Sequence, residues 1–176
     1  RDPFVRDIVY PIKNLKPDII KFTSLMTESE YAHFGEFGVS RAVVNEMKIG
    51  YNGRYLVYPY VLEDGNCYAA RCLLPGRPED NFWYGDENFF KGDFQIFDTP
   101  EIERCQGGAL FIVEGEDNLL TLKELGYPGI AVPTAADLEH ISAVHLADIK
   151  QVFIAVPNAP EAQLAAREAA TRIGFK

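Results

Sequence analysis

The stretch ALFIVEGEDNLLTLKELG, residues 109–126, decides the fold of this chain. In it an apolar run ends abruptly in Glu114 and a glycine, and a helical pattern of leucines follows. Two further apolar runs come later, GIAVP at 129–133 and QVFIAVP at 151–157. Continuous Val/Ile/Leu-rich runs separated by helical segments are typical of strands buried on both faces of a parallel sheet. The chain from residue 108 onward therefore predicts an α/β subdomain with a central parallel sheet.

The chain before this subdomain has a different texture and is rich in aromatic residues, Gly and Pro. Short helical patterns come first, and residues 54–74 then alternate apolar and polar side chains around Asp64-Gly65. That dipeptide favours a two-residue type I′ hairpin turn between antiparallel strands. We therefore expect an α+β subdomain over residues 1–107, followed by the α/β subdomain over residues 108–176.

Two helical patterns complete the predicted α/β subdomain. The first covers residues 134–149 and begins with Thr134 as its N-cap. The second begins with Asn158 as its N-cap and ends at Gly174.

Composition narrows the class of protein. A chain of 176 residues with 47% hydrophobic content forms one globular domain or two small ones. No apolar run approaches the roughly 20 residues of a membrane helix, and no export signal appears. We expect a cytoplasmic protein with no membrane partner. The net charge of -9 argues against a surface that coats nucleic acid, but it leaves room for a local basic groove.

The cysteines do not suggest a metal site. Cys67, Cys72 and Cys105 cannot all pair with one another, and they lack CxxC spacing. We expect reduced thiols, with no zinc in this fragment.

Glu114 is placed where an open parallel sheet displays its functional groups, just past the carboxyl end of a strand. Gly115 allows the backbone to turn sharply there. Two interpretations are open. Glu114 is a functional carboxylate, or it is an acidic residue favoured by the dipole of the helix that follows.

At this point the sequence resembles a known family. Residues 111–132, FIVEGEDNLLTLKELGYPGIAV, are similar to the first half of a Toprim domain, and residues 152–175 are similar to its later strand and Ala-rich helix. Residues 37–51, 54–74 and 89–102 resemble, in that order, the polymerase core of bacterial-type DNA primases and phage primase-helicases. The resemblance covers roughly residues 25–176 and implies a module of a DNA replication protein.

The resemblance also implies roles for the residues at the first strand tip. In that family the glutamate is proposed to act in general acid or base chemistry, which gives Glu114 a catalytic role. Asp residues hold Mg²⁺ for nucleotidyl transfer, because this hard cation prefers carboxylate oxygens. Asn118 stands where the family usually has an Asp, and Glu116 and Asp117 lie beside it. These three are the candidate ligands for Mg or Mn.

The sequence departs from the family at the third strand. Pro157 and Ala159 fall on the two positions of the family's Asp-x-Asp, with Asn158 between them. Neither side chain can bind a cation, so the usual ligand set is broken. One interpretation is a former active site whose fold now serves binding, with weak or lost catalysis. The alternative is an active Mg-dependent primase that makes primers using Glu114.

Nucleic-acid contact is expected in the first subdomain. Arg54, Arg71 and Lys91 match positions where the related primases carry basic residues. The implied role is charge-assisted binding to template phosphate or to nucleoside triphosphates. The implied partners are single-stranded DNA, nucleoside triphosphates and a replicative helicase domain.

The aromatic residues of this subdomain have two explanations. Phe82, Trp83, Tyr84, Phe89 and Phe90 pack in a small core, or they stack on bases.

Overall fold

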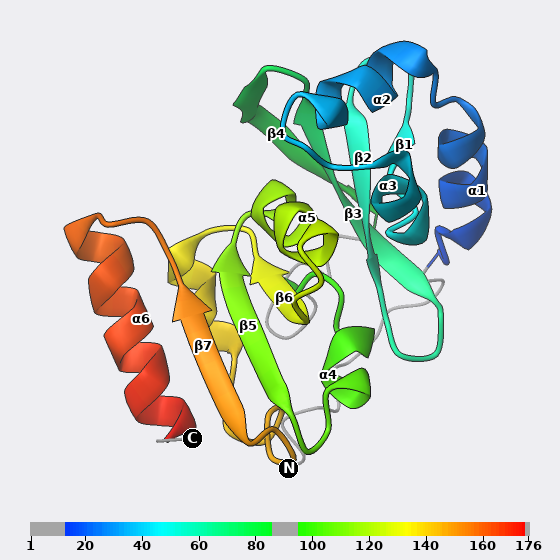
Figure 1. Cartoon of the computed structure of the whole chain (residues 1–176). Helices are drawn as coiled ribbons and strands as arrows, with labels where there is room; N and C mark the ends of the chain where they lie inside the picture. Colours follow the sequence, from blue (N-terminus) through cyan, green and yellow to red (C-terminus); the bar gives the residue numbers. More distant parts are fainter. Residues whose placement is uncertain (1–12, 86–94, 175–176) are drawn as a thin grey trace.

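Two β-sheets of different kinds organise the chain (Figure 1). The computed structural model describes residues 13–85 and 95–174. The first sheet is antiparallel with strand order β1-β2-β3-β4, and the second is parallel with order β6-β5-β7, which confirms the predicted α+β part followed by an α/β part. In chain order the elements are α1 (Lys16–Ser24), α2 (Glu28–Gly35), α3 (Arg41–Glu46), β1 (Gly50–Tyr51), β2 (Leu56–Val61), β3 (Cys67–Leu74), β4 (Arg77–Gly85), α4 (Pro100–Arg104), β5 (Ala109–Glu114), α5 (Glu116–Glu124), β6 (Gly129–Val132), the 3₁₀ helix η3 (Ala135–His140), β7 (Gln151–Ala155) and α6 (Pro160–Ile173).

The hairpin between β2 and β3 forms as predicted, but its predicted turn is wrong. A type I′ turn needs positive φ at both central residues. Of Asp64 and Gly65, only Gly65 has one, with φ at 78°. The connection is instead a longer loop in which the backbone N–H of Leu62 donates to the carbonyl of Asn66 at 2.8 Å. The Asp64 side chain stabilises this loop by accepting the N–H of Asn66 at 2.9 Å.

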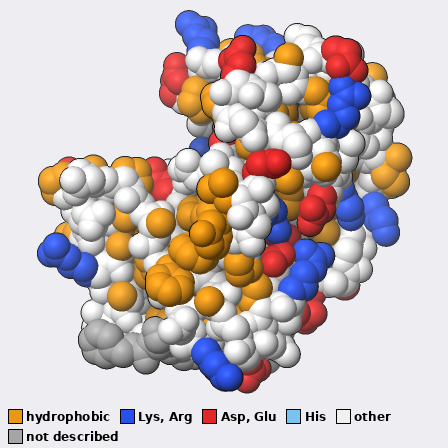
Figure 2. All heavy atoms as spheres, in the orientation of Figure 1, with side chains coloured by type: hydrophobic (Ala, Val, Ile, Leu, Met, Phe, Trp, Pro, Cys, Tyr) orange, Lys and Arg blue, Asp and Glu red, His pale blue; other side chains and the backbone are white. Residues whose placement is uncertain are grey.

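The parallel sheet has β5 in its middle and β7 at one edge of its described part (Figure 1). β6 is buried along its whole length, as predicted. The prediction that the strand in 151–157 is buried on both faces is wrong, because β7 lies at the edge: Val152 and Ile154 pack against the core, and the other three residues of β7 are exposed. Phe153 stacks on Phe111 with ring centroids 4.9 Å apart. Figure 2 shows hydrophobic side chains gathered over β5 and β7 on this face.

The predicted helix over residues 134–149 is wrong in length and type, since only η3 forms there. The contact of one backbone N–H explains why it stops. The backbone N–H of Ser142 donates to Nδ1 of His145 at 3.1 Å, so it does not extend a helix toward the carbonyl of Leu138. That carbonyl instead accepts the backbone N–H of Ile141 at 3.1 Å, which closes the last 3₁₀ turn, and a bond from the Arg172 guanidinium at 2.6 Å.

The start of α6 also differs from the prediction. Ala159, and not Asn158, is the N-cap, and no side chain caps the helix. Pro160 occupies the first helical position, where its fixed φ suits the helix and its missing N–H costs nothing. The helix ends at Gly174, as predicted.

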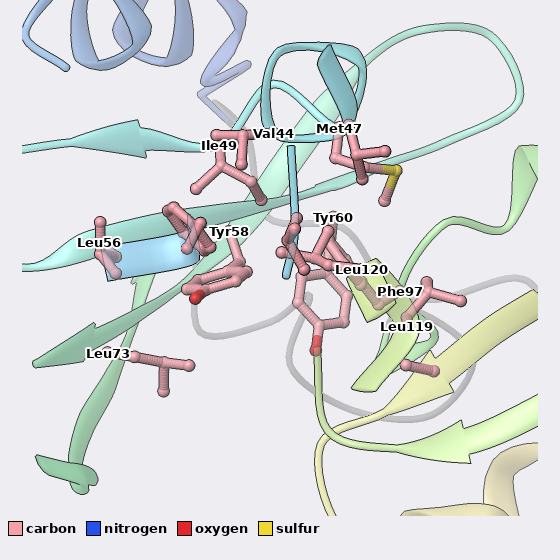
Figure 3. Close-up of a cluster of buried hydrophobic side chains, with 14 of the residues drawn as sticks. Val44, Met47, Ile49, Leu56, Tyr58, Tyr60, Leu73, Phe97, Leu119 and Leu120 are labelled. Atoms are coloured by element: carbon pink, nitrogen blue, oxygen red, sulfur yellow. The ribbon is translucent and has the colours of Figure 1, made fainter. Parts of the chain in front are cut away.

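One hydrophobic cluster joins the two sheets. Figure 3 shows its side chains from α3, β2 and α5 around Phe97. Phe97 is fully buried, its ring centroid lies 5.1 Å from that of Tyr60, and its backbone exchanges two hydrogen bonds with Ala131 of β6. The chain before residue 107 thus already pairs with the parallel sheet. The division into residues 1–107 and 108–176 stays a prediction.

Two further expectations concern the chain as a whole. No helix in residues 13–85 and 95–174 is both long and apolar enough to cross a bilayer. Cys67, Cys72 and Cys105 are free thiols in buried positions, and burial raises the pKa of Cys72 to about 12.

Replacement of Phe97 should destabilise both sheets at once. We expect Phe97→Ala to lower the free energy of unfolding by about 3–5 kcal/mol, because it leaves a cavity in the shared cluster. Phe37→Ala is the matched control, since Phe37 is 49% exposed and its loss should cost less than about 1 kcal/mol. Urea unfolding followed by circular dichroism measures both. Equal losses for the two variants would contradict a shared core.

Candidate functional site

Glu114 lies at the carboxyl end of β5, and the chain turns sharply after it. Gly115 has φ at 84°, a conformation that glycine tolerates without strain. The Glu114 Oε2 accepts the backbone N–H of Ala135 at 3.0 Å, and the Glu114 carbonyl accepts a bond from Asn118 Nδ2 at 2.7 Å. The ends of β5 and β7 border a hollow between the two parts of the molecule (Figures 1 and 2). Glu114 is therefore held at the strand tip that the sequence predicted.

Glu116 does not lie at that tip but turns toward the antiparallel sheet. Its carboxylate is 3% exposed, accepts the Tyr60 hydroxyl at 2.7 Å, and has Nη1 of Arg71 at 3.4 Å. Burial raises the pKa of Glu116, while the nearby guanidinium works in the opposite direction. The first turn of α5 is thus attached to β2 and β3 by a buried ion pair and a hydrogen bond.

Asp117 makes a parallel contact with the same strand. Its Oδ1 accepts the Tyr58 hydroxyl at 2.6 Å, and burial raises the pKa of Asp117. Tyr58 and Tyr60 are two residues apart on β2, so both point to one face of the sheet. Burial raises the pKa of both tyrosines well above the ordinary value, which keeps their hydroxyls protonated as donors.

The four residues predicted at the strand tip are therefore not gathered around one point. Glu116 and Asp117 bind tyrosines, while Asn118 is exposed and bonded to the Glu114 carbonyl. In the part of the chain that the structure describes, no three His, Cys, Asp or Glu side chains are grouped to hold a metal ion. The role of these residues as metal ligands stays a prediction.

The basic residues occupy different surroundings. Arg71 is 11% exposed on β3 and pairs with Glu116, and its Nε has no hydrogen-bond partner. Arg54 is exposed, with its guanidinium 5.3 Å from the ring centroid of Tyr55. Lys91 lies outside the described residues. The structure thus brings Arg71, but not Arg54, against the first turn of α5.

Sequence reasoning missed the two tyrosines. Tyr58 and Tyr60 are fully buried aromatic residues whose hydroxyls need a partner, and their i, i+2 spacing in a predicted strand was the available signal. The sequence alone did not indicate which acids would meet them.

These features define an α+β unit fused through a shared core to an α/β unit with an acidic residue at its central strand tip. Structural comparison finds that this fold is similar to that of solved DNA primase catalytic cores. The zinc-binding and RNA polymerase domains of the Aquifex aeolicus primase have 16% sequence identity to this chain and superpose with a TM-score of 0.74. The match covers 90% of this chain and 50% of that one. The primase fragment of the bacteriophage T7 primase-helicase gives 20% identity and a TM-score of 0.68, over 82% and 61% of the two chains.

A third similar structure is a DnaG primase catalytic domain bound to single-stranded DNA, with 12% identity and a TM-score of 0.70 over 90% of this chain and 64% of that one. The chain spans between half and two thirds of these three solved chains. Comparison with protein-family models and with curated proteins finds no match. The likeness confirms the predicted primase-type fold.

Removal of Arg71 should reveal the cost of burying Glu116 alone. We expect Arg71→Met to lower the free energy of unfolding by about 3 kcal/mol near pH 7, because an unpaired carboxylate stays buried. Without the guanidinium the folded-state pKa of Glu116 rises further, so stability falls as the pH rises above the ordinary value of 4.5. The deficit should shrink as the pH falls toward that value, where the carboxyl is protonated. Urea unfolding at several pH values measures it.

Arg54→Met is the matched control for this experiment. Arg54 is exposed, so its replacement should change the free energy of unfolding by less than about 0.5 kcal/mol at every pH. A deficit for Arg71→Met that does not depend on pH would contradict a role in neutralising Glu116.

Proposed function

We propose that this chain is a primase-like module of a DNA replication protein that binds single-stranded DNA, with weak or lost catalysis. The fold of a primase catalytic core supports the first part. The contacts of Glu116 and Asp117 carry the second part, because the buried Glu116 and the partly buried Asp117 both anchor α5 to the antiparallel sheet.

The available donors fit a catalytic Mg²⁺ or Mn²⁺ poorly. Mg²⁺ needs oxygen ligands that converge in near-octahedral geometry. Glu114 and the Asn118 amide oxygen remain at the tip of β5, while Pro157 and Ala159 follow β7 with side chains that bind no cation. We therefore propose that the Toprim-like part of this chain has a degenerate metal site.

The proposed ligands follow from the same fold. Single-stranded DNA, with nucleoside triphosphates as a second ligand, suits an exposed arginine such as Arg54, which offers charge-assisted bonds to phosphate. The proposed protein partner is a replicative helicase domain, because the chain is similar in fold to the primase fragment of a phage primase-helicase.

Metal dependence tests this proposal. We expect calorimetric titration of the wild-type chain with Mn²⁺ or Mg²⁺ to show no saturable binding, with or without a nucleoside triphosphate. Its affinity for a labelled single-stranded oligonucleotide, measured by anisotropy at constant ionic strength, should differ by less than about twofold between Mg²⁺ and EDTA. Recognition without a metal predicts this independence.

A gain-of-function variant provides the control. The triple variant Asn118→Asp, Pro157→Asp and Ala159→Asp restores carboxylates at the positions where the related primases carry them. It should acquire saturable Mn²⁺ binding that the wild-type chain lacks. Wild-type Mn²⁺ binding that Glu114→Gln abolishes, together with primer synthesis, would overturn the proposal and establish the active primase.

A further inference from the structure

An exposed aromatic residue, Phe82, lies on the outer face of the antiparallel sheet, the face that also carries Val57 and Cys72 in register with it. Leu15, which precedes α1, and Ile19 of α1 pack against the middle of this face. Phe82 on β4 is nevertheless 41% exposed. The sheet thus presents a large apolar ring to solvent at a position that a core does not require.

The neighbouring aromatic residues are explained by packing, and Phe82 is not. The ring of Trp83 lies 4.9 Å from that of Tyr60 and packs against the core shared by the two sheets. Tyr84 packs edge-on against Phe22 at 5.7 Å and donates its hydroxyl to Asp18. Of these three consecutive residues, only Phe82 keeps a large exposed area.

Phe82 belongs to a small group with a positive charge. Its ring meets that of Tyr55 edge-on, with centroids 5.0 Å apart, and the Arg54 guanidinium lies over the Tyr55 ring. Arg54 is exposed, and no acid in residues 13–85 or 95–174 forms an ion pair with it. Asp80 is on the same face of β4, but it pairs with Arg77 at 3.6 Å.

This combination has a clear chemical match. Proteins bind single strands through aromatic rings on which bases stack and through cations that follow the phosphates. A duplex hides the faces of its bases, so exposed rings favour an unpaired strand. An adjacent arginine supplies the charge-assisted bond to the backbone.

We propose that Phe82, supported edge-on by the partly buried Tyr55, forms a base-stacking platform for single-stranded nucleic acid, with Arg54 binding the adjacent phosphate. This inference rests on the proposed function and deepens it, because it names the surface that binds the strand. The platform lies on the face of the sheet opposite Tyr58, Tyr60 and the buried Glu116. Strand binding there needs neither a metal nor Glu114.

Anisotropy with two labelled oligonucleotides of equal length, one of thymidines and one of abasic sites, tests this assignment. We expect Phe82→Ala to weaken binding of the thymidine strand about 5- to 100-fold and to leave the abasic strand unchanged. Phe82→Trp should retain wild-type affinity. Arg54→Gln should weaken both strands and make the salt dependence of binding shallower by about 0.7 in the log–log slope.

Phe37→Ala controls for loss of an exposed phenylalanine, since Phe37 is 49% exposed on another part of the surface. It should bind both strands as the wild-type chain does. Wild-type binding that Phe82→Ala leaves intact would overturn the platform and leave the proposed function standing. Failure of the wild-type chain to bind any single strand would overturn both.

Discussion

The buried contact between the first turn of α5 and the strands β2 and β3 is the constraint on which the rest of this structure depends. Glu116 is enclosed with Arg71 and Tyr60, and a carboxylate removed from water needs such partners to remain charged. Since α5 begins directly after Glu114, the same contact fixes where the tip of β5 lies relative to the antiparallel sheet. The two sheets therefore act as one scaffold for the strand tip.

At this junction apolar contacts drive the association of the two sheets, and hydrogen bonds fix the position of α5. Phe97, Leu119 and Leu120 are fully buried between the sheets and provide the apolar area that drives their association. Apolar packing alone would tolerate small shifts of α5 along the sheet. The hydroxyls of Tyr58 and Tyr60 meet their carboxylates at 2.6 and 2.7 Å, so they permit one position only. A shift of α5 along the sheet would break these bonds and separate the buried Glu116 from Arg71, which penalises other registers of α5.

The sequence predicted the order of the elements well, and it predicted side-chain contacts poorly. The apolar runs at 109–114 and 129–132 became β5 and β6 because local pattern and burial agree there. The helix predicted from Thr134 stops early because the backbone N–H of Ser142 donates to the side chain of His145, a contact that the spacing of apolar residues does not encode. The predicted type I′ turn at Asp64-Gly65 does not form because the Asp64 side chain stabilises a longer loop by accepting the backbone N–H of Asn66.

The same limit applied to the candidate site. Glu114 was predicted from its place at the end of a strand, which depends on topology alone. Glu116 pairs with Tyr60, which precedes it by 56 residues, and Asp117 pairs with Tyr58, which precedes it by 59 residues. The pattern of residues along the sequence carries no information on such distant pairs. Two acids in one helical turn after a strand therefore suggest a metal site and an internal anchor equally.

Electrostatics connects this anchor to nucleic-acid binding. A chain with a net charge of -9 repels a polyanion at long range, and a bound divalent cation would offset part of that repulsion at the strand tip. In the proposed function, Glu116 and Asp117 are committed to tyrosines and Pro157 and Ala159 replace the Asp-x-Asp carboxylates, so that offset would be weak. The proposed affinity for a strand would then come from interactions that do not depend on net charge, such as stacking, with a few well-placed arginines. An acidic surface with a local aromatic and cationic cluster satisfies this requirement, and a broad basic groove is not needed.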